Sequence, residues 1–269
     1  MKVGLALGSG GARGIAHIAY LEVLDQLGIE TSAIAGSSIG ALVGALYAGG
    51  LSGRRMRDIA EGITLRDLPR FLDAPSFKEA FGIKGRKIEE WLREILPIRN
   101  FEDLPIPLRV VATDFWKGEQ VVFSSGDIAH AVRASISIPG VFQPYELDGR
   151  VLVDGGVVNP VPFDLLDDLA DFVIAIDVSG EISRAEDSRV EAKLPGFVET
   201  LIHVFSIMGN VIMEQRAKDE RIAMYQRPRL CGVRTGDFLK SGEILDSVRD
   251  DAESFRLKLI AERFTKALS

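Results

Sequence analysis

The sequence predicts an α/β fold in which helices flank a largely parallel central sheet. Segments with the pattern of buried strands alternate with segments of helical periodicity along most of the chain. Continuous apolar runs such as FVIAIDV at 172–178 are typical of strands buried on both faces, as in parallel sheets. The chain has 269 residues, 46% of them hydrophobic, which is enough for a large core.

The N-terminal part predicts two units in which a strand leads through a turn into a helix. Residues 2–7 form the first strand, 8–14 (GSGGARG) a glycine-rich loop, and 15–27 a helix with apolar residues at helical spacing. The second unit has a short strand at 33–35, a turn containing Ser38, and an almost entirely apolar helix at 39–48. Helices this apolar are usually buried, so we expect the Ser38 turn at the centre of the fold.

Residues 52–96 have a helical pattern interrupted by prolines and glycines. Phe71, Phe77 and Phe81 in this segment either pack between helices or form a lid over a pocket. The remaining predicted elements are strands at 108–113, 120–124, 151–153, 172–178 and 229–232, helices at 127–134, 197–214 and 243–267, and a charged surface loop at 181–193. No repeat or linker divides the chain, so we expect one domain over 1–269, its motifs within about 1–180 and its C-terminal helices and strand within 181–269.

The composition narrows the classes of function. The net charge of −7 argues against broad binding of nucleic acid. A basic cluster at 54–57 (RRMR) leaves peripheral contact with lipid headgroups open, although a solvated helix face is the simpler interpretation. The single cysteine, Cys231, fits a reducing compartment, and no apolar run reaches the ~18–20 residues of a membrane span. We therefore expect a cytoplasmic protein.

Two glycine-containing turns carry candidate chemistry. Ser38 lies in GSSIG at 36–40, where a strand-to-helix turn favours an exposed nucleophile over a helix-capping serine. The loop at 8–14 fits the dinucleotide pattern G-x-G-x-x-G poorly, because Arg13 stands where the last glycine is required. The other candidate ligand is the oxyanion of an acyl-transfer intermediate, bound by N–H groups near Gly10 and Gly11. Since both turns follow early strands, parallel pairing would bring them to one edge of the sheet.

Position alone leaves the proton acceptor of Ser38 open. Asp114, Asp154 and Asp177 each end a predicted strand, where a turn-forming aspartate is the default interpretation. A triad in the order serine, acid, histidine could use only His203, because His17 and His130 precede Asp154. His203 lies in an apolar helical pattern instead of a loop, so a histidine triad is disfavoured.

Together these elements resemble the patatin-like phospholipase family, in particular its small bacterial members. The resemblance rests on GSGGARG (8–14), GSSIG (36–40), ASISIPGVFQP (134–144) and VDGGVVNPVP (153–162), which occur in the family's order. It implies a patatin-like three-layer sandwich and a serine acyl hydrolase of lipid or other carboxylic esters. Ser38 would be the nucleophile, Asp154 its partner in a dyad, and Gly10, Gly11 and Arg13 the oxyanion loop.

This interpretation requires no metal or organic cofactor, since no cluster of His, Cys and Asp residues has the spacing of metal ligands. Two other classes remain open. A nucleotide-binding regulatory module would use residues 8–14 for phosphate and would turn over no ester. In a catalytically idle scaffold, Ser38→Ala would change neither hydrolysis nor covalent labelling.

The ordinary pKa of Asp154, ~3.9, is too low for an effective base near neutral pH, so burial would have to raise it.

Overall fold

The computed structural model describes residues 1–71, 82–96, 98–180 and 194–267. Its centre is an eight-stranded sheet in the order β5–β6–β3–β2–β1–β7–β8, with β4 paired to β3. The strands are β1 (Val3–Leu7), β2 (Thr31–Ser37), β3 (Leu108–Asp114), β4 (Gln120–Phe123), β5 (Tyr145–Leu147), β6 (Arg150–Asp154), β7 (Phe172–Ile176) and β8 (Ile222–Gln226). The α-helices are α1 (His17–Leu27), α2 (Ile39–Ala48), α3 (Gly53–Gly62), α4 (Leu68–Phe71), α5 (Arg86–Ile95), α6 (Ile128–Ser135), α7 (Phe197–Arg216), α8 (Ser241–Ser247) and α9 (Arg249–Ala267). Short 3₁₀ turns are η1 (Gly11–Ala16), η2 (Leu65–Asp67), η3 (Phe101–Asp103), η4 (Gly155–Val157) and η5 (Phe163–Leu166).

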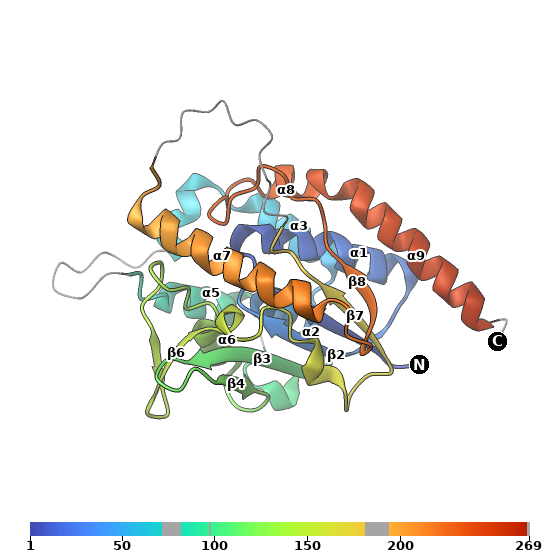
Figure 1. Cartoon of the computed structure of the whole chain (residues 1–269), viewed down its shortest axis with the longest axis horizontal. Coiled ribbons are helices and arrows are strands. Elements are labelled where there is room, and N and C mark those ends of the chain that lie inside the picture. The colour runs from blue at the N-terminus through green and yellow to red at the C-terminus, as the bar shows by residue number, and fades with distance from the viewer. Residues whose placement is uncertain (72–81, 97, 181–193, 268–269) are drawn as a thin grey trace.

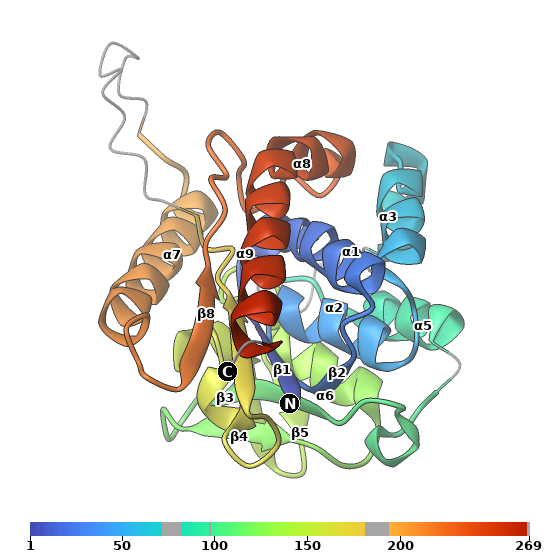
Figure 2. The same cartoon turned by 90° about the vertical axis from the view of Figure 1, so that its right-hand side faces the viewer.

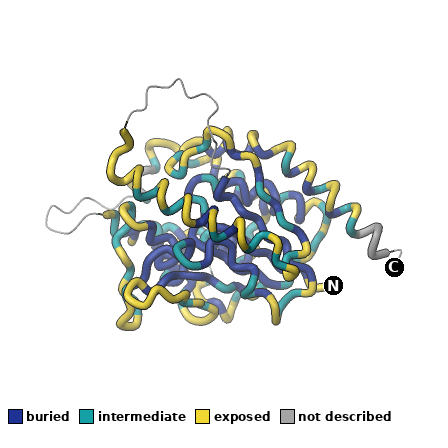
Figure 3. Tube along the Cα trace, viewed as in Figure 1, coloured by how far each residue is buried: buried dark blue, intermediate teal, exposed yellow. Residues whose placement is uncertain are grey.

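Helices cover both faces of the sheet, as the sequence predicts. Strands β3, β2, β1, β7 and β8 run parallel, so their C-terminal ends meet at one edge. Figures 1 and 2 show α1, α2 and α9 on one side of these strands and α7 on the other. The buried positions form a continuous centre between the two helical layers in Figure 3. The result is a three-layer α/β arrangement.

The alternation of side chains along β1 explains how the two faces are packed. Leu5 and Leu7 point into the larger core with α1, α2 and α9, while Ala6 points to the opposite face. On that opposite face, small alanines from the central strands meet Phe163 of η5 and Met213 of α7. The small side chains allow η5 and the C-terminal half of α7 to pack closely on the sheet.

Two predicted elements in the C-terminal part are wrong in detail. The last strand is β8 at Ile222–Gln226 and not a strand at 229–232, because Pro228 lacks an N–H group and a turn joins Leu230 to Val233. The predicted helix at 243–267 is two helices, α8 and α9, which meet at the buried Val248.

The predicted loop at 181–193 lies outside the described residues, as do Phe77 and Phe81 of the proposed lid. The third phenylalanine, Phe71, packs edge-on against Trp91 with ring centroids 5.5 Å apart, which is ordinary helix packing. The lid over 52–96 therefore stays a prediction.

Candidate active site

Ser38 and Asp154 come together because β2 and β6 share one side of β3. Ser37 ends β2 and pairs with Val111, and the next residue of β3, Ala112, pairs with Asp154. β4 pairs with β3 over the same stretch and so occupies its other side. The antiparallel β6 therefore continues the sheet where β2 ends, which brings Asp154 next to the turn that follows β2.

Ser38 occupies a tight turn from β2 into α2. Its φ of 55° and ψ of −124° are unfavourable for a residue with a side chain. Gly40 permits the turn, since a Cβ atom there would lie 2.1 Å from the carbonyl oxygen of Leu7. The unpaired N–H groups of the first turn of α2 create a positive potential beside Ser38. Such strain and placement are typical of a nucleophilic serine.

Asp154 is buried and holds the Ser38 hydroxyl. The hydroxyl donates to Oδ2 of Asp154 at 2.5 Å, and the N–H of Gly156 donates to Oδ1 at 2.8 Å. Asp154 is 0% and Ser38 2% exposed. Burial raises the pKa of Asp154 to about 7, although the hydrogen bonds from Ser38 and Gly156 act in the opposite direction. The carboxylate thus has the pKa of an effective general base near neutral pH.

The C-terminal end of α6 and the residues just after it fix the backbone of both residues, a contribution that sequence reasoning missed. Oγ of Ser135 accepts a hydrogen bond from the N–H of Ser38 at 2.8 Å. The carbonyl oxygen of Ser137 accepts from the N–H of Asp154 at 3.0 Å, and the Thr113 hydroxyl donates to the Asp154 carbonyl at 2.8 Å. The repeated serines of ASISIPG were the available signal, but their partners lie far away in the sequence.

The glycine-rich loop runs beside Ser38 and leaves two N–H groups free. The N–H of Gly8 donates to Ile176 and that of Ser9 to Pro160, each at 2.9 Å. Among the described residues, the N–H groups of Gly10 and Gly11 have no acceptor, and both glycines line the pocket above Ser38. These two groups can stabilise a negative charge that forms next to the serine.

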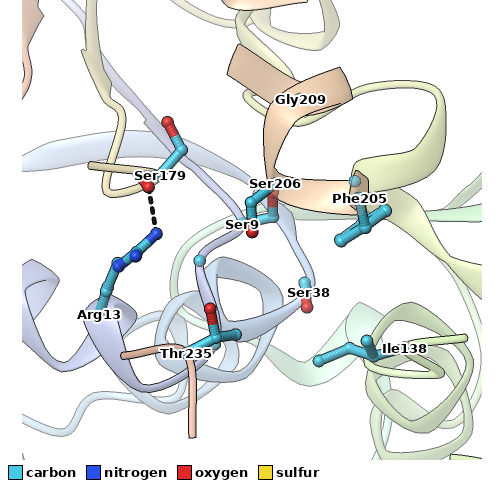
Figure 4. A pocket seen from close by; sticks show the side chains of 12 residues that line it. Ser9, Arg13, Ser38, Ile138, Ser179, Phe205, Ser206, Gly209 and Thr235 are labelled. Atoms are coloured by element: carbon cyan, nitrogen blue, oxygen red, sulfur yellow. Dashed lines mark hydrogen bonds between the residues drawn. The ribbon is translucent and has the colours of Figure 1, made fainter. Parts of the chain in front are cut away.

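Hydrogen bonds of Arg13 and His17 anchor the loop to the rest of the fold. The Arg13 guanidinium donates to the carbonyl oxygens of Ser179 at 2.5 Å and Val233 at 2.9 Å. Figure 4 shows it reaching toward Ser179 and not toward Ser38. His17 is fully buried with Nε2 2.9 Å from the carbonyl oxygen of Gly8. Burial lowers the pKa of His17 to about 4, so the ring is neutral and Nε2–H is the donor.

The other candidate acids and histidines have different partners. Asp114 accepts from the N–H groups of the turn at Trp116 and Lys117. Asp177 accepts from Ser179 and from the hydroxyl of Tyr225. His130 contacts Tyr145, and His203 lies exposed on α7. Of the three strand-end aspartates, Asp154 is the one that meets Ser38.

A small pocket opens above Ser38 (Figure 4). It has a volume of about 30 Å³. Its walls come from the glycine loop, from Ile138, from Thr235, and from Phe205, Ser206 and Gly209 of α7. Within the described residues no group of three or more His, Cys, Asp or Glu side chains could hold a metal ion.

The site therefore combines a strained serine, a buried carboxylate that accepts a hydrogen bond from its hydroxyl, and two N–H groups without acceptors among the described residues. Groups of these kinds can together support acyl transfer through a serine. Comparison with known proteins points the same way. The model of the family "Patatin-like phospholipase" matches residues 5–167. The chain therefore belongs to the patatin-like phospholipase family, as its motifs predict.

Two curated relatives illustrate the relationship. An uncharacterised NTE family protein of Mycobacterium tuberculosis is 43% identical over 192 residues, which cover 70% of this chain and 52% of that protein. Human patatin-like phospholipase domain-containing protein 6 is 33% identical over 269 residues, which cover 91% of this chain and 19% of the human protein. The chain thus spans about half the length of the mycobacterial relative and a smaller part of the human one.

Among solved structures, VipD from Legionella pneumophila matches with a TM-score of 0.61 at 14% identity, covering 96% of this chain and 67% of that one. This match concerns the fold alone. It extends beyond the residues matched by the family model and includes the C-terminal part of the chain.

Proposed function

We propose that the protein is a serine acyl hydrolase that cleaves lipid or other carboxylic esters with a Ser38–Asp154 dyad. The observation that carries the proposal is the 2.5 Å hydrogen bond between the Ser38 hydroxyl and a buried carboxylate whose pKa is about 7. Membership in the patatin-like phospholipase family supports lipid acyl hydrolysis as the class of reaction.

The chemistry proceeds in two halves. Asp154 accepts the hydroxyl proton as Oγ of Ser38 bonds to the ester carbonyl carbon, and the N–H groups of Gly10 and Gly11 stabilise the oxyanion. The intermediate collapses, the proton passes from Asp154 to the departing alcohol, and an acyl-Ser38 ester remains. Water then attacks that ester while Asp154 takes a proton from it, which releases the carboxylic acid and restores Ser38.

In this mechanism Arg13 acts on the loop. Its guanidinium already binds the carbonyl oxygens of Ser179 and Val233, so we assign it to holding Gly10 and Gly11 in place. The nucleotide-binding alternative is less well supported, because two of the loop's N–H groups, those of Gly8 and Ser9, bind carbonyl oxygens and are unavailable to a phosphate.

The experiment that tests the proposal is covalent labelling by a fluorophosphonate probe, with p-nitrophenyl ester hydrolysis measured in parallel. We expect Ser38→Ala to abolish both, and Asp154→Asn to slow both by about 10²-fold or more. If the purified wild-type chain neither labels nor hydrolyses the ester, the proposal is wrong.

The adjacent Ser37 provides a matched control. Its Oγ is buried and has no hydrogen-bond partner among the described residues. Ser37→Ala should therefore leave labelling and turnover close to those of the wild type. A loss of labelling in Ser37→Ala equal to that in Ser38→Ala would mean that disturbance of the turn, and not loss of a nucleophile, explains the result.

A further inference from the structure

Helix α7 exposes an apolar stripe along its outer side. Phe197, Val204, Met208 and Val211 recur at helical spacing, with Phe197 77% and Met208 52% exposed. No Asp, Glu, Lys or Arg occurs between residues 200 and 213. We call Phe197, Val204, Met208 and Val211 the outer face of α7; the exposed positions along the helix are visible in Figure 3. Exposed apolar stripes of this kind mark sites of interaction.

The opposite side of the same helix closes the pocket. Phe205, Ser206 and Gly209 form part of the wall above Ser38. The pocket volume of about 30 Å³ is room for roughly one water molecule, whereas small-molecule sites occupy several hundred Å³. An acyl ester can reach Ser38 only if part of this wall moves.

The two halves of α7 are attached differently. In the C-terminal half, Asn210 accepts from the Ser179 hydroxyl at 2.8 Å, Met213 is buried, and Arg216 donates to Asn159 at 2.7 Å and Asp164 at 2.6 Å. The buried residues of α7 begin only at Gly209. The N-terminal half is thus the part of the wall that can separate from the body at a small cost.

We propose that the outer face of α7 docks on a lipid interface, and that docking draws the N-terminal half of the helix away from the pocket above Ser38. The inference rests on the proposed function, since it explains how a lipid ester reaches the dyad. Lipid is favoured as the occupant because one helix carries both the apolar stripe and part of the pocket wall. A lipid bound to the outer face therefore holds the same element that covers the serine from its other side.

The chemistry of the surface specifies the kind of interface. The stripe carries no charge, and the chain has a net charge of −7, so docking depends on apolar insertion and not on anionic headgroups. The basic cluster at 54–57 in α3 is less suited to that role, because two of its three arginines already have acidic partners: Arg57 pairs with Glu22 at 2.6 Å and Arg54 with Asp58 at 3.4 Å. Zwitterionic phosphatidylcholine should therefore bind as well as an anionic lipid, with little effect of salt.

By length and composition, α7 is also the one helix of the described residues that could span a bilayer, with 17% of its apolar window buried. The side of α7 that faces the rest of the protein favours an orientation of the helix along the interface and not across the bilayer. Asn210 and Arg216 bind polar groups of the fold there, and a spanning helix would lose those hydrogen bonds.

The test is sedimentation of the whole chain with phosphatidylcholine vesicles. The variant Val204→Gln/Met208→Gln/Val211→Gln removes the apolar character of the outer face, and the control Leu65→Gln/Leu239→Gln/Leu257→Gln changes three exposed apolar residues elsewhere. We expect the outer-face variant to bind at least about tenfold more weakly and the control to bind like the wild type. Equal binding of all three, or failure of the wild type to bind, would overturn the proposal.

Labelling of Ser38 by a small soluble fluorophosphonate separates docking from catalysis. Without vesicles, the outer-face variant should label like the wild type. Vesicles should accelerate labelling several-fold in the wild type and in the control, but not in the outer-face variant. Normal labelling without vesicle binding would overturn docking and leave the hydrolase intact, whereas binding without any labelling would overturn the hydrolase. If the variant instead converts a wild-type dimer to a monomer in light scattering and vesicle binding is unchanged, the outer face is a protein interface.

Discussion

The backbone N–H of Ser38 donates to the side-chain oxygen of Ser135 at 2.8 Å, so a residue outside the strained turn fixes the position of the nucleophile. Both residues are almost fully buried. Burial restricts the replacement of a lost acceptor by solvent, and a buried N–H without a partner costs roughly 1–3 kcal/mol. The cost falls on a residue whose backbone is already strained.

Ser135→Ala should therefore lower the thermal midpoint by several degrees and slow fluorophosphonate labelling of Ser38 by about tenfold or more, with little change in KM for a soluble ester. Ser32→Ala is the matched control, since the Ser32 hydroxyl donates to Val3 at 2.9 Å away from the site. Labelling at the wild-type rate in Ser135→Ala would show that the turn holds its geometry without this contact.

The pH dependence of hydrolysis should report the pKa of Asp154. If the carboxylate must be ionised to accept the Ser38 proton, kcat/KM rises with pH and levels off above about 7, the raised pKa. An aspartate with an ordinary pKa would give a profile already flat from about pH 5. The measurement is p-nitrophenyl ester hydrolysis across the pH range in which the protein stays folded.

Asp154 should also lower the free energy of unfolding as the pH rises. In the folded protein it stays protonated up to about pH 7, whereas in the unfolded chain it ionises near pH 4. The unfolded chain binds fewer protons between these values, so the free energy of unfolding falls as the pH rises from about 4 to 7. Asp154→Asn should remove this loss and raise the free energy of unfolding at about pH 8 by up to about 4 kcal/mol. A less stable Asp154→Asn protein in urea denaturation at that pH would contradict the prediction.

His17 should have the opposite dependence. Its pKa is about 4 in the folded protein and ~6.5 in the unfolded chain, so the stability present above pH 6.5 is lost as the pH falls toward 4. His17→Gln keeps a donor for Gly8 but cannot titrate. The slope of unfolding free energy against pH between about 4.5 and 6.5 should thus be lower in His17→Gln than in the wild type, and higher in Asp154→Asn. Parallel slopes in all three proteins would show that neither group titrates as proposed.

The role of the glycine loop in catalysis can be tested by adding one methyl group to it, in the variant Gly11→Ala. Gly11 has a φ of 59°, and a Cβ there would lie 2.3 Å from Cγ2 of Thr235. Gly11→Ala should displace the loop and reduce kcat by about 10²–10³-fold, the usual cost of losing an oxyanion donor. Gly28→Ala is the control, because Gly28 has a φ of 58° with open space around its Cβ position. Equal activity in the two variants would remove the loop from the mechanism.

Local features of the site could be predicted from the residues themselves, whereas its pairing could be predicted only through the family resemblance. The Ser38 turn and the glycine loop each arise from a few neighbouring residues, which is why the pattern identifies them. Apart from that resemblance, Asp154 is distinguished from Asp114 and Asp177 only by the insertion of β6 beside the end of β2. That insertion depends on the order of strands in the sheet, and strand order is not encoded in any short segment.

The same limit explains the remaining differences. Ser135 acts on a residue 97 positions earlier, so its role is visible only after folding. The displaced last strand has a tertiary cause as well as the local one at Pro228. In the segment predicted as a strand at 229–232, the N–H of Arg229 donates to Asp251 at 3.0 Å and not to a neighbouring strand. Tertiary contacts decided the structure of that segment.

The contact between Ser38 and Asp154 joins residues 116 positions apart. Such a contact forms only after the intervening chain has closed on itself, and a partly folded chain has no means of presenting an activated serine. A probe that reacts with Ser38 would therefore count native molecules and ignore collapsed or misassembled ones. During refolding, or on protein synthesised in a cell, the rate at which labelling appears would report the time at which the last step of folding is complete.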